Sequence, residues 1–230
     1  NHNLEEQAQA LYKSWFIDFE PFKDGKFFES ELGMIPEGWL VGTVEDLSIR
    51  IASGGTPKSM NAEYYSGHIN WFSTKELKDG FLFSSEKHIT TEAVNNSAAK
   101  VFPARTVLMA IYAAPTVGRL GILSTESTFN QAAVGIIPQE SVGAEYIYLT
   151  LLSERNNLNN LASGAAQQNL NVGFVKNYKV IVPPASILDS FRKMVTPLFD
   201  TVQIKSKENL KLETTRDSLL NHLLSSELTC

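Results

Sequence analysis

The side chains that most often carry chemistry are few and scattered in this sequence. Its four histidines are His2, His68, His88 and His222, and its one cysteine is Cys230. No histidine is paired with another histidine, a cysteine or a carboxylate at the spacing of a zinc site. The sequence therefore predicts no metal site.

Sequence motifs of catalysis and cofactor binding are also missing. There is no Walker phosphate loop, no dinucleotide-binding glycine fingerprint and no nucleophile-elbow serine. The pair Pro183-Pro184 lies between Val182 and Ala185, whereas an amino-methyltransferase motif has Asn or Asp before its prolines and an aromatic residue after them. We expect no catalytic residue and no cofactor, and hence a protein that is not an enzyme by itself.

Composition indicates a globular protein of the reducing cytoplasm. Hydrophobic residues make up 43% of the 230 residues, which is enough for a core. A lone cysteine excludes an internal disulfide, and no apolar run approaches the ~20 residues that span a bilayer.

The net charge of −5 argues against a stand-alone nucleic-acid binder, which usually carries a basic surface. A protein that only specifies a site can be acidic overall if a partner supplies most phosphate contacts.

Between about Val44 and Val182 the pattern is mixed α/β with many strands. Short β-branched or aromatic runs bounded by turn residues predict strands at 47–52, 69–72, 106–112, 117–123, 132–137 and 178–182. One internal helix is expected over 145–161. The aromatic residues at 71, 72, 81 and 83 are expected in the core. The fold class is predicted to be α+β.

A helix is expected on each side of this region. Leu4, Ala8, Leu11 and Trp15 recur at helical spacing and predict a helix over 4–18. After Pro184 a second helix is expected to begin near Ser186, which with Asp189 resembles a capping box. It has no breaker before about Glu227 and would be about 60 Å long at ~1.5 Å per residue. The predicted organisation is an N-terminal helix over 1–20, a globular domain over 21–184 and a long helix over 185–230.

Apolar residues of the long helix fall on one heptad frame, interrupted by Lys205, Asn209 and Arg216. This stripe is typical of a coiled-coil seam with polar positions that fix the register. A single helix cannot bury its own seam, so we expect self-association or folding back onto helix 4–18. Pro197 is expected to kink or loosen the helix. The predicted helix–helix interface residues are Leu188, Phe191, Val195, Leu198, Val202, Leu212, Leu219 and Leu223.

A series of short motifs, in order along the chain, resembles one family. They are Ser53-Gly-Gly-Thr-Pro-Lys58, Tyr65-Ser-Gly-His-Ile-Asn-Trp71, Ser73-Thr-Lys-Glu-Leu77, Thr106-Val-Leu-Met-Ala-Ile111, Val117-Gly-Arg-Leu-Gly-Ile122, Asn130-Gln-Ala132, and Ser163-Gly164 with Gln167-Gln-Asn-Leu170. The long helix closes on Asp217-Ser-Leu-Leu-Asn-His-Leu-Leu-Ser-Ser-Glu-Leu228, with Ser226 where the family usually has Gly. In order, these motifs are similar to a recognition domain of a type I restriction-modification specificity subunit.

The resemblance implies a role in DNA recognition. Such subunits typically carry two recognition domains, each reading half of a split DNA site, joined by two antiparallel helices that dock two methyltransferase subunits. A restriction and motor subunit joins indirectly. The segment Tyr12 to Glu20 resembles the end of the helix before a second recognition domain. With one domain, this chain is expected to be either the distal half of a larger subunit or a half-size subunit that pairs with itself.

Candidate DNA-binding residues follow from the chemistry of base and phosphate contacts. Arg and Lys suit guanine and phosphate, and Asn and Gln suit adenine. Two glycines before Thr56 would let backbone amides approach a phosphate, whereas Gln131 is as readily structural, tying a strand end. The predicted DNA-binding residues are Thr56, Lys58, Lys75, Tyr112, Arg119, Gln167, Gln168 and Asn169.

Two other functions remain open at this point. The globular region could be a scaffold that reads no sequence, or a glycan- or peptide-binding module with a dimerisation helix, which the acidic composition favours. Selective enrichment of a short DNA motif would separate DNA recognition from both.

Overall fold

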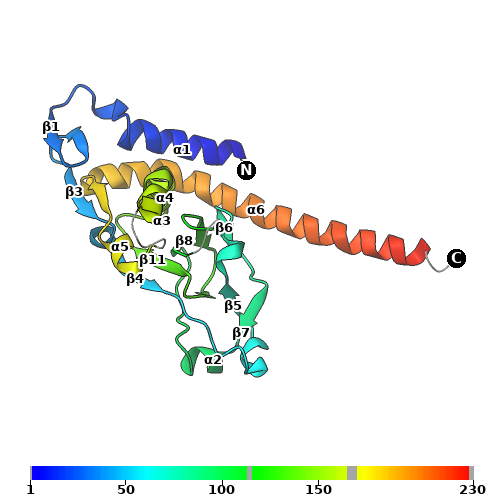
Figure 1. The fold of residues 1–230 in the computed structure, drawn as a ribbon. Coiled ribbons are helices and arrows are strands. Elements are labelled where there is room, and N and C mark those ends of the chain that lie inside the picture. The colour runs from blue at the N-terminus through cyan, green and yellow to red at the C-terminus, as the bar shows by residue number, and fades with distance from the viewer. Residues whose placement is uncertain (1, 113–115, 165–169, 228–230) are drawn as a thin grey trace.

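The computed structural model describes residues 2–112, 116–164 and 170–227. A sheet-containing domain lies beneath two helices, α1 (His2–Phe16) and α6 (Ala185–Glu227), as Figure 1 shows. The α+β prediction is confirmed. None of the helices described here is long and apolar enough to cross a membrane.

A five-stranded sheet forms the centre of the domain. Its order is β4 (Ser48–Ser53), β11 (Ala133–Pro138), β8 (Val107–Ala110), β9 (Leu120–Leu123) and β6 (Phe81–Leu82). Neighbours are antiparallel except for the parallel pair β6 and β9. All four residues of β8 and all four of β9 are buried. Their continuous apolar runs therefore reflect a sheet covered on both faces, not a half-exposed one.

Smaller sheets surround this centre. The order β10 (Thr128–Phe129), β5 (Ile69–Phe72) and β7 (Lys87–Ile89) forms a three-stranded sheet beside the short helix α2 (Thr91–Asn95). A hairpin joins β1 (Phe27–Ser30) to β2 (Gly33–Pro36), and β3 (Leu40–Thr43) pairs antiparallel with β12 (Lys179–Val182). Short 3-10 turns lie at 20–22, 45–47, 62–65 and 74–76.

An aromatic cluster fixes the helices on the sheet. Figure 1 shows α1 running antiparallel to the first half of α6. The ring centroids of Phe16 and Phe191 are 4.8 Å apart, and those of Phe16 and Tyr146 are 4.9 Å apart. Tyr146 belongs to α3 (Ala144–Ser153), so one ring of α1 joins both α6 and α3. The hydroxyl of Tyr12 donates to Thr150 Oγ1 at 3.1 Å within the same contact.

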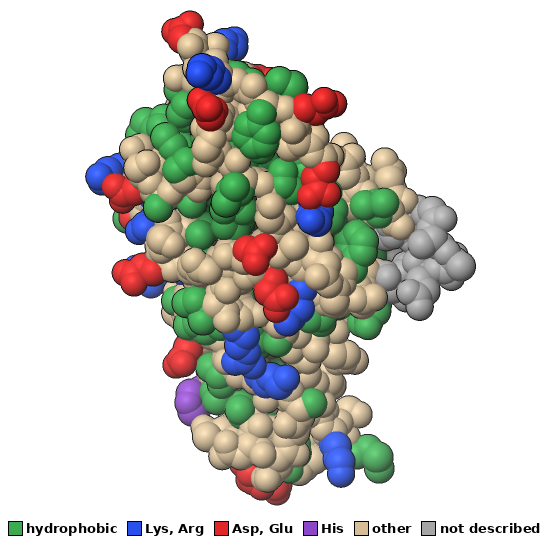
Figure 2. Space-filling view, turned by 90° about the vertical axis from the view of Figure 1, so that its left-hand side faces the viewer, with side chains coloured by type: hydrophobic (Ala, Val, Ile, Leu, Met, Phe, Trp, Pro, Cys, Tyr) green, Lys and Arg blue, Asp and Glu red, His purple; other side chains and the backbone are tan. Residues whose placement is uncertain are grey.

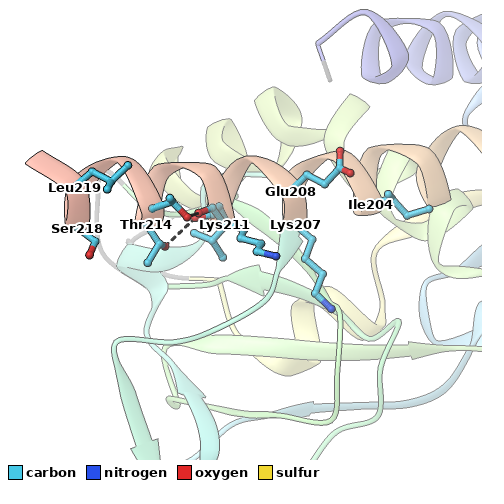
Figure 3. Close-up of a pocket in the computed structure, with 9 residues that line it drawn as sticks. Ile204, Lys207, Glu208, Lys211, Thr214, Ser218 and Leu219 are labelled. Carbon is cyan, nitrogen blue, oxygen red and sulfur yellow. Dashed lines mark hydrogen bonds between the residues drawn. The ribbon is translucent and has the colours of Figure 1, made fainter.

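The second half of α6 extends away from the domain. Figure 1 shows it projecting beyond the domain, and Figure 3 shows the side chains along it. A shallow concave surface along it is lined by α6 residues alone, from Ile204 to Leu219. The side chain of Leu212 is 66% exposed and that of Leu219 is 58% exposed. This stretch has a stripe of apolar residues that nothing covers within the described chain.

Two local predictions need correction. The single helix expected over 145–161 is two helices, α3 and α4 (Arg155–Gly164), which are separated at Glu154. The α6 helix begins at Ala185, where the Pro184 carbonyl accepts from Ile187 N at 2.9 Å, and Asp189 forms an ion pair with Lys193 and no capping box. Pro197 lies inside α6, and the kink or loosening expected there stays a prediction.

Candidate nucleic-acid interface

Strand register brings four separate segments to one end of the central sheet. Ala133 of β11 pairs with Ala110 of β8, and Ile111 N donates to Ala132 O at 2.9 Å. The pairing of Val134 with Ser53 places the chain after β4 at the same end. The Ala110 amide donates to Arg119 O at 2.9 Å. The segments that contain Thr56, Tyr112, Arg119 and Gln131 therefore all emerge at this end, which we call the recognition end.

A fifth segment arrives through the three-stranded sheet. Strand β10 is parallel to β5, with Phe129 opposite Phe72, and Asn130 N donates to Phe72 O at 2.9 Å. The turn at 74–76 follows β5 directly and carries the exposed side chain of Lys75. The capping box of this turn is closed by Glu76, whose Oε2 accepts from Ser73 N at 2.7 Å. Lys75 thus lies on a locally fixed turn close to Asn130 and Gln131.

Thr56 and Gln131 meet across this surface. The hydroxyl of Thr56 donates to Gln131 Oε1, and both residues are exposed. This contact links the end of the β4 segment to the β10–β11 connection. The prediction that Gln131 ties a strand end agrees with this contact, although its side chain is not buried.

The two glycines before Thr56 do not present free amides. Gly54 N donates to Ala133 O at 3.2 Å, and Gly55 N donates to Phe129 O at 2.9 Å. A Cβ on Gly55 would lie 2.2 Å from the backbone of Ala98. The expected phosphate approach by these amides is therefore wrong, because both are engaged in the fold. Glycine is needed here for close backbone packing.

Tyr112 and Arg119 flank the connection between β8 and β9. The side chain of Tyr112 is exposed, and its carbonyl accepts from Thr116 Oγ1 at 3.1 Å. Arg119 directly precedes β9 and is half-buried, and its amide donates to Thr116 O at 2.9 Å. Arg119 is therefore a turn residue at the sheet end and not a strand residue as expected.

The recognition end carries basic side chains that are not neutralised by ion pairs among the described residues. Lys58, Lys75 and Arg119 form no ion pair with any acidic side chain of the described part of the chain. Two of the carboxylates nearby are engaged: Glu76 accepts from the amides of Ser73 and Glu86, and Asp79 pairs with Arg155. Lys58, Lys75 and Arg119 are therefore open to an anionic partner, whereas Glu76 and Asp79 already accept hydrogen bonds from this chain.

One side of the molecule carries mixed charge. Figure 2 shows acidic and basic side chains interspersed over one side of the molecule, with no continuous basic stripe on that face. The expectation that basic residues cluster on one face stays a prediction. Such a distribution suits contacts at a few defined positions better than a long electrostatic track along DNA.

Part of the predicted site lies outside the described residues. Gln167, Gln168 and Asn169 belong to this part. Helix α4, which precedes them, packs against the β8–β9 connection: Arg155 Nε donates to Gly118 O at 2.9 Å. The first turn of α4 therefore lies at the recognition end.

The predicted helix–helix residues divide into two groups. Leu188, Phe191, Val195 and Val202 are buried and Leu198 is partly buried, where α1, α3 and the domain cover α6. The outer group, Leu212, Leu219 and Leu223, is exposed. Phe199, which the heptad frame omitted, is buried and stacks edge-on against Tyr148. The inner half of the seam is thus filled by this chain itself.

Sequence reasoning missed Lys78, Asp79 and Arg155 at the recognition end. Lys78 is exposed beside the turn before β6. The pair Asp79-Gly80 is a turn signal, and both residues have positive φ, 64° and 91°. Nothing in the sequence ties Asp79 to Arg155, because the two are 76 residues apart.

Comparisons with known proteins agree with this architecture. The chain is similar to the type I restriction enzyme HindI specificity subunit of Haemophilus influenzae, with 27% identity over 99% of this chain and 62% of that protein. It is similar to the MjaIX specificity subunit of Methanocaldococcus jannaschii, with 25% identity over 99% of this chain and 54% of the relative. The chain thus spans only about half to three fifths of these curated relatives.

Solved structures support the fold. An S subunit of a type I restriction-modification system from M. genitalium matches with a TM-score of 0.59 at 14% identity, over 95% of this chain and 50% of that one. The HsdS subunit from Thermoanaerobacter tengcongensis matches with a TM-score of 0.55 at 15% identity, over 87% of this chain and 46% of that one. Both align with about half of a larger chain.

The matched family covers most of the sequence. The type I restriction modification DNA specificity domain matches residues 36–214, from β2 to the exposed half of α6. The chain belongs to this family. The resemblance inferred from the ordered motifs is confirmed.

Proposed function

We propose that this chain recognises one half of a bipartite DNA site as the specificity component of a type I restriction-modification complex. The convergence of Thr56, Lys58, Lys75, Tyr112 and Arg119 on one end of the sheet carries this proposal. These residues come from separate segments, and their cations are not neutralised by acidic side chains of the described chain. An anionic ligand with readable edges, such as double-stranded DNA, fits that combination.

The acidic composition fits a division of labour between subunits. Phosphate contacts supply most of the affinity for DNA, whereas base contacts supply specificity. A chain with a net charge of −5 can specify a site while methyltransferase subunits provide much of the phosphate contact. These methyltransferase subunits are the proposed direct partners, and a restriction and motor subunit would join through them. A cytoplasmic location follows from this role.

The exposed half of α6 is the proposed place of assembly. Its apolar stripe from Ile204 to Leu219 is exposed and is not covered by the described chain. A second helix would bury it, supplied by a second copy of this chain or by the remainder of a larger subunit. The methyltransferase subunits would dock on the helices so paired. The chemistry of methyl transfer and cleavage would reside in those other subunits, so this chain is proposed to be non-catalytic and to need no cofactor.

Selection from a random duplex library tests the proposal. The chain is incubated with the library alone and with a type I methyltransferase subunit, and bound duplexes are sequenced. Enrichment of a short motif in either arm is the expected result. Equal recovery of all sequences in both arms would contradict DNA reading and leave a scaffold or a glycan- or peptide-binding module in its place.

A further inference from the structure

An arginine–carboxylate pair lies at the recognition end, next to the start of β9. Arg155, the first residue of α4, donates from Nη1 to Asp79 Oδ2 at 3.0 Å and from Nη2 to Asp79 Oδ1 at 2.5 Å. This is the two-pronged geometry in which the planar guanidinium matches a carboxylate. The Arg155 side chain is 26% exposed and that of Asp79 is 35% exposed, so water screens the pair only in part.

The same two side chains hold the backbone on both sides of Arg119. Arg155 Nε donates to Gly118 O at 2.9 Å, and Asp79 Oδ1 accepts from Leu120 N at 3.0 Å. The Asp79 amide in turn donates to Leu120 O at 3.0 Å. One compact network therefore joins the turn before β6, the start of β9 and the first turn of α4.

The network maintains backbone conformations that side chains do not favour. Asp79 has φ 64° and Gly118 has φ 79°, both in the left-handed region. A Cβ on Gly118 would lie 2.8 Å from Asn159 Oδ1 of α4, so the helix and the turn are in close contact. Left-handed residues are retained where surrounding contacts determine them. Here those contacts are the hydrogen bonds of Arg155 and Asp79.

We propose that Arg155 and Asp79 are positioning residues for DNA readout. They fix the direction in which Arg119 leaves the sheet and the place where α4 begins, without touching DNA themselves. This inference rests on the proposed function. Arg155 is occupied by a carboxylate and a carbonyl, which distinguishes it from Lys58, Lys75 and Arg119. Lysine cannot replace it, because an ammonium group does not reproduce a fork of parallel donors.

The expected signature is a loss of discrimination rather than of general affinity. A good bidentate base contact discriminates by roughly 5- to 150-fold. If the backbone around Arg119 loosens, the ratio of affinities for the cognate duplex and its single-base variants should fall by about tenfold. The dependence of affinity on salt should stay unchanged, since no phosphate contact is lost.

The test uses Arg155→Lys and Asp79→Asn in the full chain, assembled with a methyltransferase subunit. The probes are the duplex enriched by the wild-type chain and its single-base variants, measured at several salt concentrations. Lys176→Gln is the matched control, because Lys176 pairs with Glu45 near the other end of β4 and is similarly exposed at 34%. Both test variants should lose discrimination, and the control should keep it.

Hydrogen exchange separates positioning from a general loss of structure. In Arg155→Lys, the amides of Gly118 and Leu120 should exchange faster, while those of β8 and β11 should keep their wild-type rates. Unchanged discrimination in both variants overturns the positioning role alone. A shallower salt dependence in a charge-removing variant, Arg155→Gln, also overturns it, since Arg155 would then contact phosphate. If the wild-type chain enriches no duplex, the proposed function fails and this inference fails with it.

Discussion

At the scale of single residues, Lys58 is the sharpest test of a phosphate contact. Its side chain is exposed two residues after Thr56 and forms no ion pair with the described part of the chain. If it meets a phosphate, Lys58→Ala should weaken binding to all duplexes about equally. The plot of log affinity against log salt should become shallower by about one unit. Binding titrations at several salt concentrations measure both effects.

The contrast with a base-reading side chain makes this prediction specific. Gln168→Ala, in the segment expected to read bases, should reduce discrimination between cognate and altered duplexes by roughly 5- to 150-fold. General unfolding would not separate the two effects. The assignment of roles is reversed if Lys58→Ala alters base preference while Gln168→Ala weakens every duplex uniformly.

Residue types indicated exposed candidate side chains, but they did not indicate the partners of buried or distant groups. The exposure of Lys58, Lys75 and Tyr112 agrees with their being candidates for an external ligand. The amides of Gly54 and Gly55 were misread, because their acceptors belong to strands about 75 residues further along. The same limit hid the pair of Asp79 and Arg155. Pairings between distant segments depend on sheet register, which local patterns do not contain.

At the scale of elements, the inner half of α6 should carry much of the stability. Phe191 is fully buried among rings of α1 and α3, whereas Leu212 is 66% exposed. Phe191→Ala should lower the free energy of unfolding by about 3–5 kcal/mol. Leu212→Ala should change it by less than about 0.5 kcal/mol in a monomer. Urea denaturation of dilute protein measures both, and equal losses would contradict the division of the helix.

The contribution of Tyr12 to the stability of the contact between α1 and α3 should be lost at alkaline pH. Burial raises the pKa of Tyr12 to about 12. A tyrosine in the unfolded chain ionises near pH 10. Between these values the folded state retains a proton that the unfolded state has lost. Stability is therefore fully present below pH 10 and falls as pH rises towards 12.

Tyr12→Phe should remove this contribution. Denaturation at pH 7 should show a loss of about 1 kcal/mol from the missing hydrogen bond to Thr150. Between pH 10 and 12 the variant should lose stability less steeply than the wild type, by roughly 1 kcal/mol per pH unit. Parallel pH profiles for the two proteins would show that Tyr12 ionises equally in both states.

The long helices and the apolar strands of the domain were predictable, and the small strand pairs around them were not. The expected strand at 69–72 has the bounds of β5, and the two flanking helices lie within two residues of their predicted ends or starts. Strands β1, β2 and β3 were missed, and although a strand was expected at 178–182, its pairing as β12 with β3 depends on register between distant segments. The split at Glu154 was hidden by apolar residues that continue on both sides.

At the scale of the whole molecule, the heptad stripe has two environments. Its inner residues pack against α1 and the domain, so this chain itself covers that half of the stripe. From Ile204 to Leu223 the stripe remains exposed, over a length of about 30 Å at ~1.5 Å per residue. Soluble monomers seldom expose apolar surface of this extent, which marks it as a place of association.

We therefore expect the chain to dimerise through the outer half of α6, as a half-size subunit that restores two domains and two helices would. Light scattering should give twice the chain mass of 25.5 kDa.

Leu219→Asp should dissociate the dimer, because it places a charge in the apolar contact. Asn221→Asp is the matched control: it adds the same charge about 200° around the helix and should leave the mass unchanged. A wild-type monomer, or a Leu219→Asp protein of unchanged mass and melting temperature, would contradict this assignment. A monomeric wild type would favour the remainder of a larger subunit as the partner of this stripe.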